Sequence, residues 1–152
     1  MIGAIAAFAG KDRIDQRLLI HAALLHLFVA AAVHVLPFGR LRRLLHLIGG
    51  AGVRSDIPAD PSARIVQAVR TVTARLPGGN CLTEALIAQC LLAGDGCETT
   101  LCFGIGRDRP AHRPFDAHAW LESNTRHLIG ARAIVYDRLR HPGRCASSPS
   151  PR

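Results

Sequence analysis

The chain has 152 residues, of which 49% are hydrophobic and 20% charged, so it is long and apolar enough for a globular domain with its own core. The formal net charge of +8 comes almost wholly from arginine, but no helix-turn-helix, zinc-knuckle or aromatic-platform pattern accompanies it, which argues against nucleic-acid binding. The five cysteines include no C-x-x-C pair, which argues against a disulfide scaffold and a metal site. We therefore expect a protein of the reducing cytoplasm, without cofactor or metal.

The N-terminal part is predicted to be helical. The first residues lack a positive region before their apolar stretch and do not resemble a signal peptide. The apolar pattern predicts a helix over 14–36, ended by "PFG". Residues 18–36 carry no formal charge and approach the length of a membrane span. Because its histidines point in different directions and its alanines lower its hydrophobicity, we expect this helix to pack on protein or to associate with a membrane surface, rather than to span.

Two more helices follow in chain order. The basic stretch "RLRRLLHLI" predicts a short helix that ends at Gly49 and Gly50. Residues 51–60 have turn composition and form a plausible linker. Asp60 and Pro61 then supply an N-cap and a proline at the first helical position, and "PGG" ends the helix that they begin.

In the second half of the chain, the spacing of the apolar residues changes from a helical to a strand-like period. Asn80 caps a helix whose apolar stripe ends at "AGDG". Residues 99–106 and 116–122 are strand-like, 116–130 resembles a hairpin, and "AIVYD" adds a last strand. Helices first and antiparallel strands after them indicate an α+β fold. We divide the chain into an N-terminal helical region (1–52), a core (53–140) and a disordered tail (141–152).

Cys81 directly follows the predicted cap, so it is the first residue of its helix. Unpaired N–H groups and the helix dipole stabilise a thiolate at this position. Cys90 falls about half a turn away on the helical wheel, on the apolar stripe, and is the better candidate for inert packing. The structural alternative for Cys81 is a small buried hydrophobe. The functional alternative is a nucleophile whose backbone N–H stabilises an oxyanion.

A thiolate nucleophile needs a histidine as general base and acid. His118 lies in the strand "DAHAWLE" and shares one face of that strand with Trp120, which we interpret as core or cleft wall. The flanking alanines leave room for a helix to approach closely. A cysteine at a helix start, packed on a small antiparallel sheet that bears a histidine, is the arrangement of papain-like and transglutaminase-like cysteine enzymes.

The segments "NCLTEALIAQCLLAGDG", "LCFGIGRD" and "FDAHAWLE" resemble, in order and spacing, the transglutaminase-like protein B family of lasso-peptide biosynthesis. The resemblance extends upstream to "LPFGRLRRLL" and covers roughly residues 15–130. It implies a leader peptidase that cuts a ribosomally made precursor peptide, with Cys81 as the nucleophile and His118 as its base. It also implies a separate asparagine-synthetase-like cyclase that closes the ring.

Some members of that family carry a small winged-helix, leader-binding domain in front of the peptidase. This chain has no room for one before its helical part, so the resemblance implies the stand-alone peptidase of a split system, with a separate leader-binding partner. Two other hypotheses remain open. One is a non-catalytic scaffold that recruits precursor and cyclase. The other is a basic protein that associates with membranes or nucleic acid.

The chain departs from that family at one position. The family supplies an aspartate about a dozen residues after the histidine to orient the imidazole, and the residue at that spacing here is Gly130. Glu122 is too far along the strand, about 13 Å from His118. Asp137 is the expected orienting acid, if the chain returns beside the hairpin. The alternatives are Asp116, Asn124 and a backbone carbonyl.

Overall fold

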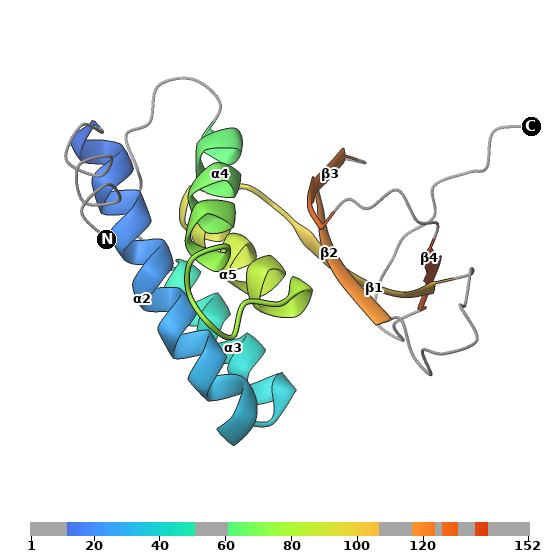
Figure 1. Ribbon diagram of the computed structural model, residues 1–152. Coiled ribbons are helices and arrows are strands. Elements are labelled where there is room, and N and C mark those ends of the chain that lie inside the picture. The colour runs from blue at the N-terminus through green and yellow to red at the C-terminus, as the bar shows by residue number, and fades with distance from the viewer. Residues whose placement is uncertain (1–11, 51–60, 107–116, 124–125, 131–135, 140–152) are drawn as a thin grey trace, which may run out of the picture.

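The computed structural model describes residues 12–50, 61–106, 117–123, 126–130 and 136–139, and in them the expected α+β fold is confirmed (Figure 1). The helices are α2 (Arg13–Val35), α3 (Phe38–Gly50), α4 (Pro61–Thr73) and α5 (Cys81–Gly94). The strands are β1 (Thr100–Gly106), β2 (Ala117–Ser123), β3 (Arg126–Ile129) and β4 (Tyr136–Arg138). The expected linker, the expected tail, Asp116 and Asn124 lie outside the described residues.

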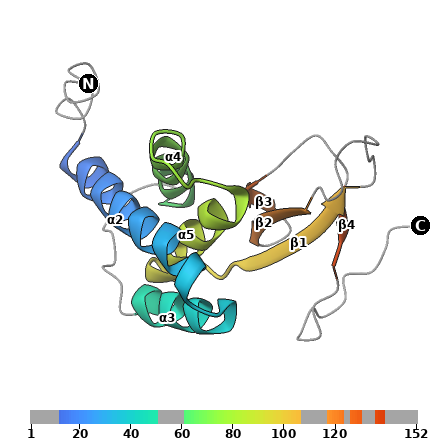
Figure 2. The same ribbon diagram turned by 60° about the horizontal axis from the view of Figure 1, so that its bottom comes forward.

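The helices form one group and the sheet lies on one side of it (Figures 1 and 2). Helix α2 packs along α4 and α5, and α3 packs against α5. Apolar side chains from all four helices and from three strands form one core; the largest fully buried ones are Leu41, Ile65, Leu86, Ile87, Leu92, Leu121, Ile129, Val29 and Val69. Residues on both sides of the expected boundary at 52 and 53 therefore contribute to the same core.

Close packing of α3 on α5 depends on Gly49. A Cβ at this position would lie 2.7 Å from the backbone oxygen of Cys90 and 3.1 Å from the Cβ of Ala93. Because a backbone oxygen cannot rotate away, glycine is needed here. The Cys90 thiol is buried and donates to the backbone oxygen of Leu45 at 3.4 Å, which adds a second contact between the two helices.

The sheet is antiparallel, with the strand order β3-β2-β1-β4. Leu101, Leu121 and Ile129, one residue from each of the first three strands, join the helical core. β2 is the strand that packs most extensively on α5, whereas β4 pairs only with β1 among the described strands. The last strand was predicted at "AIVYD"; the structure begins β4 at Tyr136, and residues 131–135 lie outside the described part.

Candidate active site

Cys81 is the first residue of α5, and Asn80 caps the helix in front of it. The Asn80 Oδ1 accepts a hydrogen bond from the Thr83 N–H at 2.9 Å, and the Asn80 backbone oxygen accepts one from the Glu84 N–H at 2.9 Å. Neither bond uses the Cys81 N–H. The half-buried thiol of Cys81 therefore lies where the helix start stabilises negative charge.

Two contacts from α2 hold the turn that leads into Cys81. His26 is fully buried and donates from Nε2 to the backbone oxygen of Pro77 at 2.9 Å. Gly78 has a φ of +80°, and a Cβ there would lie 3.3 Å from the Cβ of Ala30. Glycine thus provides both the left-handed backbone conformation and the fit against α2. Helix α2 is in this way part of the support for the candidate nucleophile.

His118 lies in β2, where it pairs with Gly104 of β1. Its side chain is only 5% exposed, and its ring stacks on that of Trp120, with a centroid distance of 6.2 Å and an interplanar angle of 18°. Trp120 is itself held by a hydrogen bond from Nε1 to Oε1 of Glu122 at 2.7 Å. The indole therefore forms a fixed wall against the imidazole.

The backbone oxygen of Gly130 lies 2.5 Å from Nε2 of His118. A carbonyl can only accept, so this hydrogen bond requires the proton on Nε2. In the neutral ring Nδ1 is then the basic nitrogen, and it is the one able to take a proton from a thiol. The orienting group thus comes from the residue at the spacing where the lasso family supplies aspartate, and a backbone carbonyl was one of the alternatives left open by the sequence.

Gly130 has no room for a side chain in this conformation. Its φ is +80°, and a Cβ would lie 2.8 Å from the backbone oxygen of Ala119 and 2.9 Å from the Cβ of Trp120. An aspartate at this position would need both a strained backbone and a shift of β2. The close approach of Gly130 to β2 is what brings its carbonyl to the imidazole.

Glu84 is a half-buried carboxylate on α5, one helical turn after Cys81. Burial raises the pKa of the Glu84 carboxyl, and the charges of Arg70 and His118 oppose that rise. β2, the strand that carries His118, packs on α5, the helix that begins with Cys81. Sequence reasoning missed Glu84; its spacing of three residues from Cys81 was the available signal.

The backbone register does not bring Asp137 beside His118. β4 is separated from β2 by β1, and Asp137 pairs with Ile105, which pairs in turn with Ala117. His118 pairs instead with Gly104, one register position along the strands. The Asp137 prediction depended on the chain returning beside the hairpin. The chain does return to the sheet as β4, but β4 lies beside β1, on the side of β1 away from β2.

The other cysteine of α5 lies in a different environment. Cys90 is buried in the core, and desolvation raises the pKa of its thiol to about 11. This environment opposes a thiolate and suits a packing role. In the described part of the chain, no three histidine, cysteine or acidic side chains come together as a metal site.

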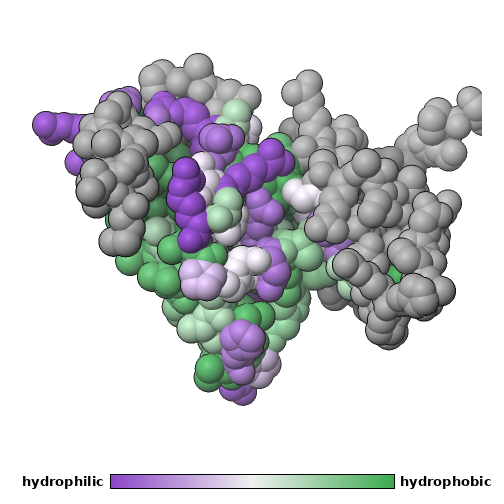
Figure 3. Space-filling view, viewed as in Figure 1, coloured by the Kyte–Doolittle hydropathy of each residue, from purple (hydrophilic) through white to green (hydrophobic). Residues whose placement is uncertain are grey.

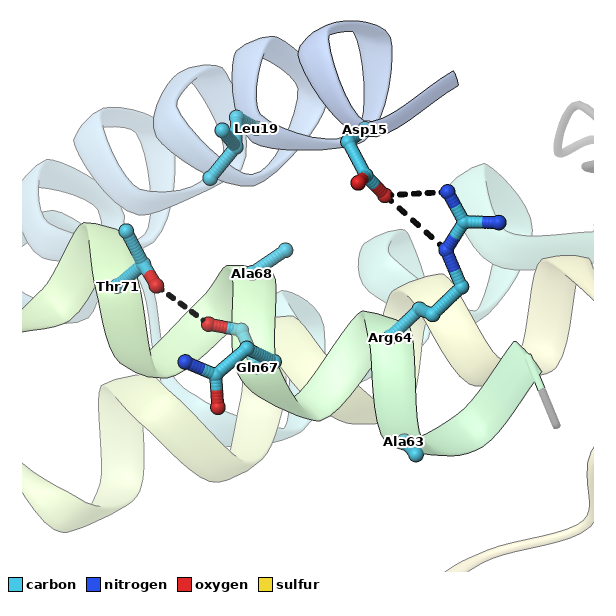
Figure 4. Close-up of a pocket in the computed structure, with 7 residues that line it drawn as sticks. All are labelled: Asp15, Leu19, Ala63, Arg64, Gln67, Ala68 and Thr71. Carbon is cyan, nitrogen blue, oxygen red and sulfur yellow. Dashed lines mark hydrogen bonds and ion pairs between the residues drawn. The ribbon is translucent and has the colours of Figure 1, made fainter. Parts of the chain in front are cut away.

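A cavity of about 250 Å³ lies between α2 and α4 (Figure 4). Its lining residues are Asp15, Leu19, Ala63, Arg64, Gln67, Ala68 and Thr71. Arg64 donates from Nε to Oδ1 of Asp15 at 3.0 Å and ties the two helices together. Neither Cys81 nor His118 lines this cavity, so it is separate from the candidate active site.

Comparison with known protein families matches residues 25–140 to the transglutaminase-like superfamily. No curated protein and no solved structure matches the chain. The matched region includes α3, α4, α5, the whole described sheet and much of α2. It also includes the helix start at Cys81, the strand of His118 and the carbonyl of Gly130. The chain therefore belongs to the transglutaminase-like superfamily.

Proposed function

We propose that the protein is a cysteine peptidase that removes the leader from a ribosomally made lasso-peptide precursor, with Cys81 and His118 as its catalytic dyad. The observation that carries this proposal is the hydrogen bond between Nε2 of His118 and the oxygen of Gly130. It fixes the ring and its tautomer, as an orienting side chain does in a triad. A non-catalytic scaffold does not require a histidine whose ring and tautomer are fixed, and we therefore favour the peptidase.

In the first half of the reaction, the Cys81 thiol transfers its proton to Nδ1 of His118, and the thiolate attacks the carbonyl carbon at the end of the leader. The negative charge on the substrate oxygen is stabilised by the backbone N–H of Cys81. The imidazolium then gives its Nδ1 proton to the departing amine. The C–N bond breaks, and a thioester joins Cys81 to the leader.

In the second half, His118 takes a proton from water, and the hydroxide formed attacks the thioester carbon. The C–S bond breaks, the leader leaves as a carboxylic acid, and the Cys81 sulfur recovers a proton. The Gly130 carbonyl holds the Nε2–H in both halves, so the ring keeps one orientation while Nδ1 alternates between base and acid.

The resemblance to the lasso-peptide family supplies the finer parts of the proposal. The substrate is the precursor peptide, a separate winged-helix protein presents its leader, and an asparagine-synthetase-like cyclase takes the released core peptide. Cys81, Cys90 and Cys97 form no disulfide within the described residues, which agrees with action in the reducing cytoplasm.

The test is leader removal in a mixture of this protein, its precursor and the leader-binding partner, followed by mass spectrometry. Cys81→Ala should abolish cleavage, because no other group replaces the nucleophile. His118→Ala should lower the rate by about 10²-fold or more, the usual contribution of a general base.

Cys90→Ala is the matched control, since it removes a thiol from the same helix but from the core. It should retain most of the activity. Full cleavage by the Cys81→Ala variant would contradict Cys81 as the nucleophile, and absence of cleavage by the wild type would leave the non-catalytic scaffold as the better account. Equal losses from both cysteine variants would also contradict the assignment of Cys81.

A further inference from the structure

The outer side of α2 is apolar along almost its whole length. Ile20, Leu24, Leu27 and Val35 are 49%, 59%, 56% and 79% exposed, and Phe28 is 37% exposed. Their spacing of three, four and seven residues places them on one stripe. Large aliphatic side chains this exposed, and this regularly spaced, mark an interaction surface rather than scattered surface hydrophobes.

Helix α3 extends this surface. Leu47 is 64% exposed, and two further large apolar side chains of α3, Leu44 and Ile48, are also exposed. In Figure 3 the hydrophobic surface follows the side of the helical group that is turned away from the sheet. We call the exposed apolar residues of α2, together with Leu44, Leu47 and Ile48 of α3, the outer helical face. Phe38 is not part of it, because its ring packs on that of Phe103 in β1.

The charge around the outer helical face is strongly positive. Five exposed arginines come from the same two helices: Arg13, Arg17, Arg40, Arg42 and Arg43. The acidic residues of this part of the chain are Asp12 and Asp15, and both lie within 3.9 Å of Arg64 on α4. The acidic groups are thus directed toward α4, and the arginines dominate the field at the outer helical face.

A transmembrane span does not fit this geometry, although α2 is long and apolar enough to cross a bilayer. Leu18, Ala22 and Val29 on its inner side are buried in the protein, and His26 is bound to the turn before Cys81. To span, α2 would have to leave the core. Only the outer side of α2 is accessible to lipid.

A second copy of this chain does not fit either, because two faces with the same arginines would repel each other. Tight protein interfaces are enriched in tryptophan and tyrosine, whereas the large apolar residues of the outer helical face are aliphatic or phenylalanine. Apolar side chains flanked by arginine are typical of helices that lie in the interface of an anionic bilayer.

We propose that the outer helical face docks the protein on an anionic lipid surface, with α2 and α3 lying in the interface and the rest of the domain in water. The buried His26, which holds the turn before Cys81, lies on the opposite side of α2 from the exposed stripe. Docking therefore leaves the support of the candidate nucleophile intact. This proposal does not depend on the proposed peptidase activity.

Vesicle flotation with the full chain tests the proposal. The protein should float with vesicles of phosphatidylcholine and phosphatidylglycerol, bind much less to phosphatidylcholine alone, and dissociate as salt is raised. Arg42→Gln should weaken binding about fivefold, the factor expected for one basic side chain near an anionic surface. A double variant, Leu24→Ser with Leu27→Ser, should weaken it by at least about tenfold.

Matched control variants lie outside the outer helical face. Leu139 is 53% exposed on the sheet side, and Leu139→Ser should leave flotation unchanged. Arg75→Gln, two residues after the end of α4, should also leave flotation unchanged. Urea unfolding establishes that each variant is folded. Substitutions at exposed positions are expected to change the free energy of unfolding little.

Three results would overturn the proposal. One is absence of flotation with anionic vesicles. Another is equal binding to neutral and anionic vesicles. The third is equal loss from the Leu139→Ser control and the α2 double variant. If flotation is absent while the α2 double variant loses a complex with the leader-binding protein or the cyclase, the outer helical face is a protein interface instead.

Discussion

Replacing Gly130 by alanine should lower both stability and activity, because this glycine carries the carbonyl that orients His118. Its φ of +80° lies in the left-handed region, where a side chain costs about 1–2 kcal/mol. The new Cβ would also lie 2.8 Å from the oxygen of Ala119 and 2.9 Å from the Cβ of Trp120, and overpacking of this kind costs about 1–3 kcal/mol. The free energy of unfolding should fall by about 2–5 kcal/mol.

Gly96→Ala separates the two contributions. Gly96 has a similar φ of +76°, but a Cβ there would meet nothing within 4 Å. Only the backbone conformation should matter, so the loss should be about 1–2 kcal/mol. At a urea dependence of about 2 kcal/mol per molar, the unfolding midpoint should move by about 1–2.5 M for Gly130→Ala and by about 0.5–1 M for Gly96→Ala.

The activity of the same two variants tests the role of the carbonyl. Relief of the overlap at residue 130 has to move either β2 or the carbonyl, and a displacement of about 1 Å near the reacting groups can lower a rate by about 10²-fold. Leader removal by folded Gly130→Ala should therefore fall at least about tenfold, while Gly96→Ala keeps the wild-type rate. Equal midpoints and equal rates for the two variants would refute this reasoning, and so would a Gly130→Asp variant faster than wild type.

Two further predictions concern the carboxylates. Glu84→Gln replaces the carboxyl by a neutral amide that does not titrate. Burial raises the pKa of the Glu84 carboxyl above 4.5 in the folded wild type. The wild type therefore loses stability as pH rises through that raised pKa, because the buried carboxyl becomes charged. The urea midpoint of the variant relative to wild type should therefore increase between about pH 4 and pH 8, and a difference that does not vary with pH would contradict the burial argument. Asp137→Asn should change the cleavage rate less than about twofold, because β4 pairs with β1 and not with β2; a tenfold loss with folding intact would make Asp137 the orienting acid after all.

The helices and the start of α5 were predictable because their signals are local. Asn80 before an apolar stripe is a cap signature, and the structure has α5 begin at Cys81 with Asn80 bonded to Thr83. The change from helical to alternating periodicity likewise located β1 and β2. A periodic pattern and a capping residue are set by neighbours in the chain, so they can be read before the fold is known.

The contacts that surround His118 and support Cys81 were not predictable in the same way. Whether the last strand lies beside β2 or beside β1 depends on tertiary packing, and this order decides where Asp137 falls. The hydrogen bond to Gly130 uses a backbone oxygen, which no residue type signals. The bond from His26 to Pro77 joins segments far apart in the sequence. Each of these contacts exists only after the core has formed.

The central claim is that Cys81 is the nucleophile and His118 its general base. It is tested most directly by the rate at which iodoacetamide alkylates Cys81 at about pH 7, followed on the Cys81 peptide by mass spectrometry. A base beside the thiol promotes formation of the reactive thiolate, so the rate should fall by at least about tenfold in His118→Ala, while Cys90 remains unmodified in both proteins. Equal alkylation rates of Cys81 in the wild type and in His118→Ala would contradict the claim.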